Sequence, residues 1–80
     1  MKIELLYFAQ LRDAFGDGDT IVVNAEATVG DVVASIRGRD EWRAVKDLPL
    51  RYAVNEVVVD ENTALCDGDT LALLPPVSGG

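Results

Sequence analysis

The residues best suited to chemistry in this sequence are the last two, Gly79 and Gly80, which end in a terminal carboxylate. Glycine has no Cβ, so this backbone can pass through a narrow channel and adopt torsions closed to other residues. The carboxylate is inert by itself, but an acyl adenylate made with ATP would turn it into an acyl donor. Attack by a sulfur nucleophile would then leave a thiocarboxylate, which is a nucleophile at neutral pH. The ending therefore suggests group transfer; the alternative is a frayed terminus without a role.

The residues before this pair separate it from the folded part of the chain. Residues 71–74, Leu-Ala-Leu-Leu, have the length and composition of a short buried strand. Pro75 and Pro76 end that strand, because proline has no N–H to donate to a sheet. The final six residues can extend roughly 20 Å at about 3.3 Å per residue. We therefore expect a folded domain over residues 1–74 and a flexible tail over residues 75–80.

Composition and charge exclude several classes of function. The 80 residues suffice for one domain with a small core. The formal net charge is −7, and the sequence has no histidine. Nucleic-acid binding needs clustered Lys and Arg, and histidine is the commonest general base and metal ligand. We expect a protein partner with a basic groove, no nucleic acid, no metal site and no self-contained hydrolase; acidity alone also serves solubility.

The cysteine content and the apolar runs indicate the compartment. Cys66 is the single cysteine, so it cannot form an internal disulfide, which is typical of a reducing compartment. Residues 1–4 do not lead into the apolar run of a signal peptide, and no apolar run is long enough to span a bilayer. We expect a cytoplasmic protein that does not use a membrane.

The hydrophobic pattern predicts an α+β domain with one main helix on one face of a mixed sheet. That helix is expected to begin at Thr28, whose hydroxyl can cap it together with Asp31, and to stop at Gly38. Strands are expected at residues 2–8, 20–24, 51–54, 57–59 and 70–74, and helical turns at 9–15 and 40–46.

Two large apolar side chains of the first strand face away from the core. Leu6 and Phe8 alternate with Lys2 and Glu4 on the solvated face of that strand. If the first and last strands are parallel neighbours, joined by a right-handed crossover, Leu74 lies with Leu6 and Phe8 on the helix-free face. We predict that this apolar patch, beside the root of the tail, contacts a partner; the alternative is scattered surface residues without a role.

The chain resembles the small, sulfur-carrying subunits of molybdopterin synthase, a ubiquitin-like β-grasp family, over essentially its full length. The resemblance rests on Tyr-Phe-Ala and Leu-Arg near the start, Thr-Val at the helix, Ala-Val-Asn at a turn, Asp-Gly-Asp before the last strand and Pro-Pro-Val-Ser-Gly-Gly at the end; these are residues 7–9, 11–12, 28–29, 53–55, 67–69 and 75–80. The final motif is the most specific. One departure is Leu73-Leu74, where many relatives have aromatic residues.

The resemblance implies a β-grasp fold and a sulfur-transfer mechanism. A ubiquitin-activating-type enzyme would adenylate Gly80 with MgATP, and a sulfur donor protein would convert it to a thiocarboxylate. The tail would then enter the large synthase subunit and give its sulfur to cyclic pyranopterin monophosphate. Two small and two large subunits would form the assembly. Acid–base groups would belong to the large subunit, so this chain would supply a reagent, would not itself be the catalytic subunit and would bind no cofactor.

The resemblance also implies the site residues. Gly80 would hold the reacting group and Gly79 would allow it passage. Partner contacts are expected from the apolar patch and the tail, that is from Leu6, Phe8, Leu74, Pro75, Pro76, Val77 and Ser78. Three alternatives remain: a sulfur carrier for thiamine thiazole or another product, a ubiquitin-like modifier that forms isopeptide bonds through Gly80, and a binding module with an inert tail.

Overall fold

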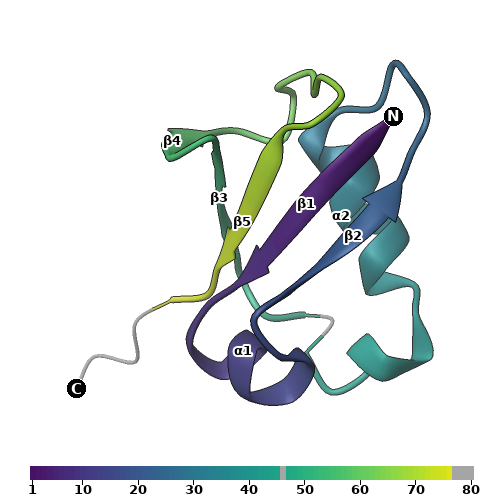
Figure 1. Cartoon of the computed structure of the whole chain (residues 1–80). Coiled ribbons are helices and arrows are strands. Elements are labelled where there is room, and N and C mark those ends of the chain that lie inside the picture. Colours follow the sequence, from purple (N-terminus) through teal and green to yellow (C-terminus); the bar gives the residue numbers. More distant parts are fainter. Residues whose placement is uncertain (46, 77–80) are drawn as a thin grey trace.

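The computed structural model describes residues 1–45 and 47–76, and five strands of this part form one mixed sheet (Figure 1). The strands are β1 (Lys2–Tyr7), β2 (Gly18–Val22), β3 (Arg51–Val54), β4 (Val57–Val59) and β5 (Thr70–Leu74). The helices are α1 (Ala9–Phe15), α2 (Val29–Arg37) and a short 3-10 helix, η1 (Asp40–Trp42). The expected α+β architecture is confirmed.

The first and last strands lie side by side in the middle of the sheet, whose order is β2-β1-β5-β3-β4. β1 and β5 are parallel, with Glu4 opposite Thr70 and Tyr7 opposite Leu73. The other neighbours are antiparallel. This confirms the predicted pairing of the two terminal strands, and it brings the end of β1 and the end of β5 to the same edge of the domain (Figure 1).

The core fills the space between one face of the sheet and α2. Alternate residues of β1 and β5 point into it, and α2 contributes its apolar face; together these are Ile3, Leu5, Tyr7, Leu71, Leu73, Val29, Val32, Val33 and Ile36. α2 begins as predicted: the Thr28 hydroxyl accepts from the Asp31 N–H at 3.2 Å, and the Asp31 carboxylate accepts from the Thr28 N–H at 3.0 Å. The opposite face of the sheet has no helix over it among the described residues (Figure 1).

Three predicted boundaries differ from the structure. β2 runs over Gly18–Val22 and not over 20–24, because Gly18 pairs with Leu6 at a point where a Cβ would collide with the carbonyl oxygen of Leu5. Phe8 is the N-cap residue of α1 and not the last residue of β1. The second helical turn is shorter than 40–46, and Lys46 lies outside the described residues.

The turn between β3 and β4 is tight and anchored. Asn55 and Glu56 both have positive φ, 50° and 73°, as a two-residue type I′ hairpin requires. The Asn55 side chain fixes this turn to β5, since its Oδ1 accepts from the Thr70 N–H at 3.0 Å and its Nδ2 donates to Asp69 at 2.9 Å. Asn tolerates positive φ, but glutamate at the second position is strained.

We expect Glu56→Gly to stabilise the domain by about 0.5–1 kcal/mol, because relief of the left-handed strain exceeds the added entropy of glycine in the unfolded chain. Urea denaturation at pH 7 measures this change. The matched control is Glu26→Gly, at an exposed carboxylate whose φ is not positive. Equal or lower stability of Glu56→Gly, relative to the wild type, would contradict the assignment of strain.

An aromatic cluster fastens α1 to the end of the sheet. The ring of Phe15 stacks on Trp42 with centroids 4.6 Å apart, and Tyr7 meets both rings at 5.6 and 6.1 Å. Burial of Tyr7, helped by the negative charges of Asp19 and Glu41, raises the pKa of its hydroxyl above the ordinary value of 10.0.

This pKa predicts a loss of stability in alkali. Above pH 10 the unfolded chain releases the Tyr7 proton before the folded chain does, so the free energy of unfolding falls as the pH rises through this range. Tyr7→Phe should match the wild type at pH 7 within about 0.5 kcal/mol and should lose less stability between pH 9 and 11. Parallel pH profiles of the two proteins would refute the role of Tyr7.

Candidate functional site

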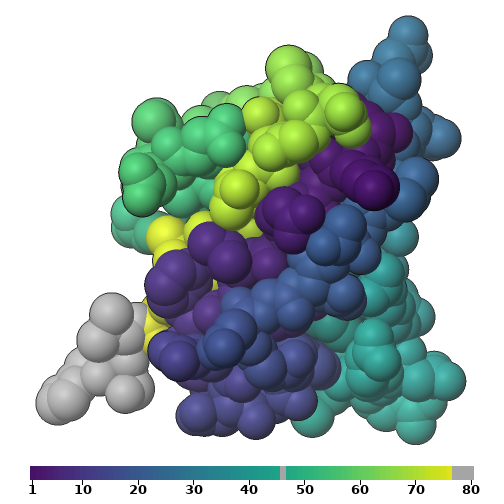
Figure 2. Space-filling model, in the orientation of Figure 1, coloured from purple at the N-terminus to yellow at the C-terminus, as the bar shows by residue number. Residues whose placement is uncertain are grey.

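The structure brings the three predicted patch residues together on the helix-free face. Leu6 is opposite Ala72 on β5, and Ala72 is opposite Ala53 on β3, so these three point to the same side of the sheet. Phe8 and Leu74 extend the face toward the tail. Leu6 and Phe8 are 39% and 43% exposed, and Leu74 is half-buried. Figure 2 views this face, with the chain's first strand in purple beside its last strand in yellow.

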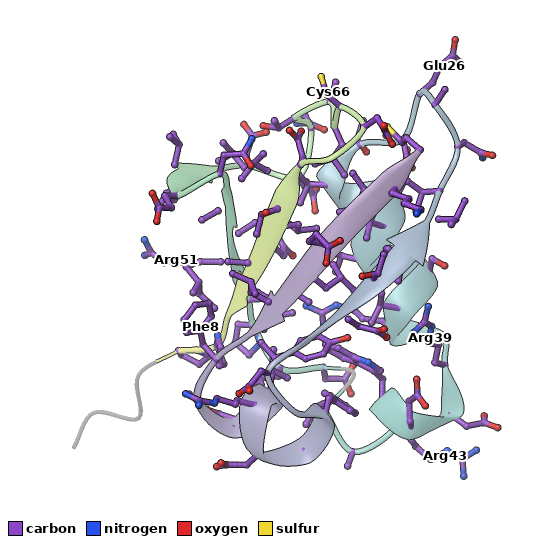
Figure 3. All side chains as sticks on the ribbon, in the orientation of Figure 1. Phe8, Glu26, Arg39, Arg43, Arg51 and Cys66 are labelled. Carbon is purple, nitrogen blue, oxygen red and sulfur yellow. The ribbon has the colours of Figure 1, made fainter. Side chains whose placement is uncertain are left out.

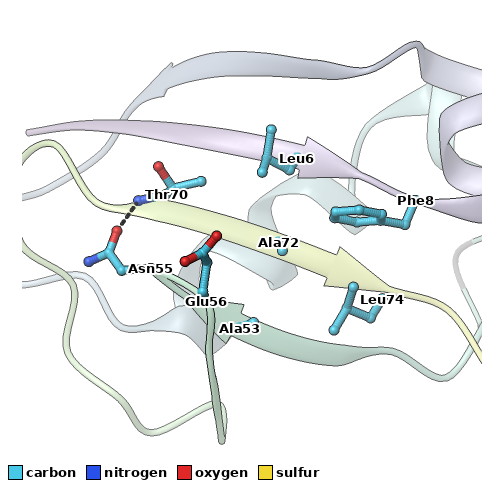
Figure 4. Close-up of a pocket in the computed structure, with 8 residues that line it drawn as sticks. All are labelled: Leu6, Phe8, Ala53, Asn55, Glu56, Thr70, Ala72 and Leu74. Carbon is cyan, nitrogen blue, oxygen red and sulfur yellow. Dashed lines mark hydrogen bonds between the residues drawn. The ribbon is translucent and has the colours of Figure 1, made fainter.

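A hollow of about 480 Å³ lies within this face, and we call it the outer hollow (Figure 4). It exists because Ala53 on β3 and Ala72 on β5 are paired on adjacent strands, and their small side chains leave space between larger neighbours. Its remaining lining consists of apolar walls and one polar end, formed by Leu6, Phe8, Leu74, Asn55, Glu56 and Thr70. The predicted patch is therefore concave.

A second hollow, of about 620 Å³, adjoins the point where the chain leaves the sheet, and we call it the tail-root hollow. Phe8 and Leu74 line both hollows and so separate them. The other lining residues come from the start of α1, the segment before β3 and the end of the described chain: Ala9, Pro49, Leu50, Arg51, Pro75 and Pro76. The apolar surface therefore continues from the middle of the sheet to the root of the tail.

One charged side chain borders each hollow. Glu56 lies at the outer hollow, and Figure 4 shows its carboxylate raised in front of β5. Arg51 lies at the tail-root hollow near Phe8 (Figure 3). Within residues 1–45 and 47–76, neither side chain forms an ion pair. Both are exposed and open to an outside partner.

Residues with a left-handed backbone line both hollows. Among the described residues other than glycine, positive φ occurs at Ala9, Asn55 and Glu56. Ala9 lines the tail-root hollow, and the other two line the outer hollow. Strained residues that a fold retains cluster at binding sites, where they fix the shape of a surface. This observation supports a binding role for the face without using its hydrophobicity.

The tail residues divide between the described and undescribed parts of the chain. Pro75 is buried and Pro76 is exposed, so Pro76 offers the larger accessible surface. Val77, Ser78, Gly79 and Gly80 lie outside the described residues, and the predictions made for them stay predictions. No helix in the described part is long and apolar enough to cross a membrane. Within the same part, no group of three His, Cys, Asp or Glu side chains is arranged to hold a metal ion.

The sequence pattern missed several residues of this face. Val58 pairs with Ala53, which puts it on the same side of the sheet, and it is 64% exposed. The run Val57–Val59 has no polar residue to mark its solvated side, so periodicity could not separate Val58 from the core. Ala53, Ala72 and Glu56 were also missed, because a hollow made by small residues depends on strand register.

Neighbouring leucines on opposite faces of β1 provide a test of this assignment. Leu6→Ser should cost under about 1 kcal/mol of stability, since Leu6 is 39% exposed and the serine hydroxyl can reach solvent. Leu5→Ser should cost roughly 3–5 kcal/mol, because Leu5 is 1% exposed and its loss leaves a cavity and a buried hydroxyl. Thermal or urea unfolding measures both variants. Similar costs would mean that Leu6 serves the fold and not a partner.

Comparisons with known proteins find a family and several relatives to which this chain is similar. The model of the ThiS family matches residues 5–80. The molybdopterin synthase sulfur carrier subunit of Escherichia coli K12 is 38% identical over 80 residues, covering 98% of this chain and 99% of the relative. Small archaeal modifier protein 3 of Haloferax volcanii is 36% identical over 92 residues, covering all of both chains.

Solved structures agree with this placement. The chain superposes with a TM-score of 0.73 and 27% identity on a protein–protein complex of subunits 1 and 2 of molybdopterin-converting factor from Helicobacter pylori, covering 100% of both chains compared. It also superposes on the Caldiarchaeum subterraneum ubiquitin with a TM-score of 0.63 and 24% identity, covering 100% of this chain and 98% of that one. The second likeness shows the shared fold alone and confirms the ubiquitin-like β-grasp arrangement.

Proposed function

This chain belongs to the ThiS family, and we propose that it is the sulfur-carrier subunit of a molybdopterin synthase. The observation on which the proposal rests is the continuous apolar surface that runs from the outer hollow to Pro76, at the root of a Gly-Gly tail. The name of the Escherichia coli relative and the two-subunit complex from Helicobacter pylori support it.

The proposed chemistry takes place at the carboxyl group of Gly80. In the activating enzyme a carboxylate oxygen bonds to the α-phosphorus of MgATP, and pyrophosphate leaves. A donor's sulfur, at the oxidation level of sulfide, then attacks the carbonyl carbon. The bond from that carbon to the AMP oxygen breaks, AMP leaves with the electron pair, and a thiocarboxylate remains. In the large subunit the thiocarboxylate sulfur would bond to a carbon of the pterin precursor, from which an oxygen substituent leaves. Water would then cleave the bond between the Gly80 carbonyl carbon and the sulfur, which leaves the sulfur on the pterin and restores the carboxylate.

The folded domain would place this group. Four residues follow Pro76, and they span at most roughly 13 Å at about 3.3 Å each. When a partner binds the outer face, the sulfur on Gly80 therefore stays within about 13 Å of Pro76 and so close to that partner. The reaction then takes place within one complex and needs no second encounter in solution. The large subunit would contact the apolar patch of Leu6, Phe8 and Leu74. Its channel would hold the tail residues Pro76, Val77, Ser78 and Gly79.

The remaining partners follow from the same chemistry. The chain has no histidine and would contribute no acid–base group, so the adenylating enzyme, the sulfur donor protein and the large subunit would supply all catalysis. MgATP would be bound by the adenylating enzyme and not by this chain. We place the cycle in the cytoplasm, since the single cysteine forms no disulfide.

A second candidate is a protein modifier. It is favoured by the 36% identity to small archaeal modifier protein 3 over the whole of both chains. Activation at Gly80 would be the same, but a lysine amine of a target protein would attack the carbonyl carbon of the adenylate, or of a thioester that an enzyme cysteine had formed by displacing AMP. AMP or that thiol would leave, and an isopeptide bond would form. Denaturing gels that show this chain attached to other proteins would support this candidate against the first.

Intact mass after incubation with ATP, the adenylating enzyme and a sulfur donor tests the proposal. We expect a shift equal to the replacement of one oxygen by sulfur, because the thiocarboxylate differs from the carboxylate by that exchange alone. Adding the large subunit and the pterin precursor should return the mass to its original value.

The control is a chain that lacks Gly80, which should show no shift while its thermal unfolding matches the wild type. An unchanged wild-type mass, under conditions that convert the Escherichia coli relative, would refute the proposal. A shift that persists after the large subunit and the precursor are added would assign the sulfur to another acceptor.

A further inference from the structure

We propose that the outer hollow is a slot for one cationic side chain of the large subunit, with Glu56 as its counter-ion. This inference deepens the proposed function and rests on it. The occupant is a lysine or arginine whose aliphatic stem lies over Ala53 and Ala72 and whose charge meets the Glu56 carboxylate. We therefore expect the large subunit to present a basic residue beside an apolar contact surface.

The lining of the hollow has the composition that such a side chain requires. The floor and walls are apolar and come from Ala53, Ala72, Leu6, Leu74 and Phe8. They suit the methylene groups of a long cationic side chain, which bury their stem and keep the charge at a polar end.

The polar end of the slot offers one unpaired charge. Asn55 and Thr70 also line it, but the Asn55 amide already bonds to Asp69 and to the Thr70 N–H. Glu56 makes no hydrogen bond or ion pair with any other described residue. A carboxylate at the mouth of an apolar slot selects a cation, and the net charge of −7 favours approach of a basic surface.

The backbone holds Glu56 in place at some cost to the fold. A type I′ turn prefers Asn-Gly, and here the second position has φ of 73° with a full side chain. The preceding Asn55 fastens the turn to β5 through both ends of its amide. The carboxylate is therefore presented from a rigid position, and retention of glutamate where glycine is favoured has an explanation in binding.

The test is calorimetric titration of this chain with the purified large subunit of its synthase, at low and at physiological salt. Glu56→Gln keeps the shape and removes the charge. We expect its Kd to rise about tenfold at low salt, as for loss of a charge-assisted hydrogen bond, and its dependence on salt to flatten. Glu56→Asp keeps the charge and should lose less affinity than Glu56→Gln.

The matched control is Glu26→Gln, which changes the net charge equally at an exposed carboxylate that does not line the outer hollow and lies far from Phe8 (Figure 3). At physiological salt its Kd should stay within about twofold of the wild type, since long-range charge is screened there over roughly 8 Å. At low salt its Kd should rise less than that of Glu56→Gln, because it removes no direct contact. Thermal unfolding of all variants checks that folding is unchanged.

Two results would overturn the slot while leaving the proposed function intact: equal Kd values for Glu56→Gln and Glu26→Gln, or equal losses for Glu56→Gln and Glu56→Asp. The first would show that Glu56 meets no cation, and the second that the side chain acts through its shape. Absence of any binding by the wild type would overturn both the slot and the synthase assignment.

Discussion

The parallel pairing of β1 with β5 determines where every part of the candidate site lies. The two strands come from opposite ends of the chain, and Glu4 to Tyr7 lie opposite Thr70 to Leu73. Parallel neighbours end at the same edge of a sheet, so Phe8 and the tail emerge together. An antiparallel pairing would have put them at opposite edges. The apolar face and the Gly-Gly tail form one unit because of this pairing.

The same pairing explains how a small domain can leave apolar residues uncovered. Each central strand divides its side chains, with Leu5 and Leu71 buried against α2 and Leu6 and Ala72 directed outward. The buried half is sufficient for a core, because Trp42 and Leu11 close its end. The large apolar side chains of the outward half, Leu6 and Phe8, stay partly exposed and are available for a partner.

Much of this arrangement was predictable, and the failures have physical causes. Alternation in β1 correctly assigned Leu6 and Phe8 to the outer face, and Thr28 with Asp31 marked the start of α2, because both signals are local. The start of β2 was not predictable. Gly18 lies in a run of Gly and Asp that is typical of a turn, and only its pairing with Leu6 makes it a strand residue. The hollow was missed for a related reason, since two alanines become a floor only when the register sets them opposite each other.

Glu56 illustrates why a binding surface is harder to predict than a core. Asn55 indicates the turn between residues 51–54 and 57–59, and the structure confirms that turn. Glycine, the residue favoured at the second position, is absent, so the strain at Glu56 is visible only in its φ of 73°. A core residue agrees with local propensity, periodicity and burial at once. A residue kept for a partner can oppose local propensity, because the partner supplies the missing stabilisation. Residues that violate a local rule beside an uncovered apolar face are therefore the ones to examine first, and in this chain Ala9 and Glu56 both border that face.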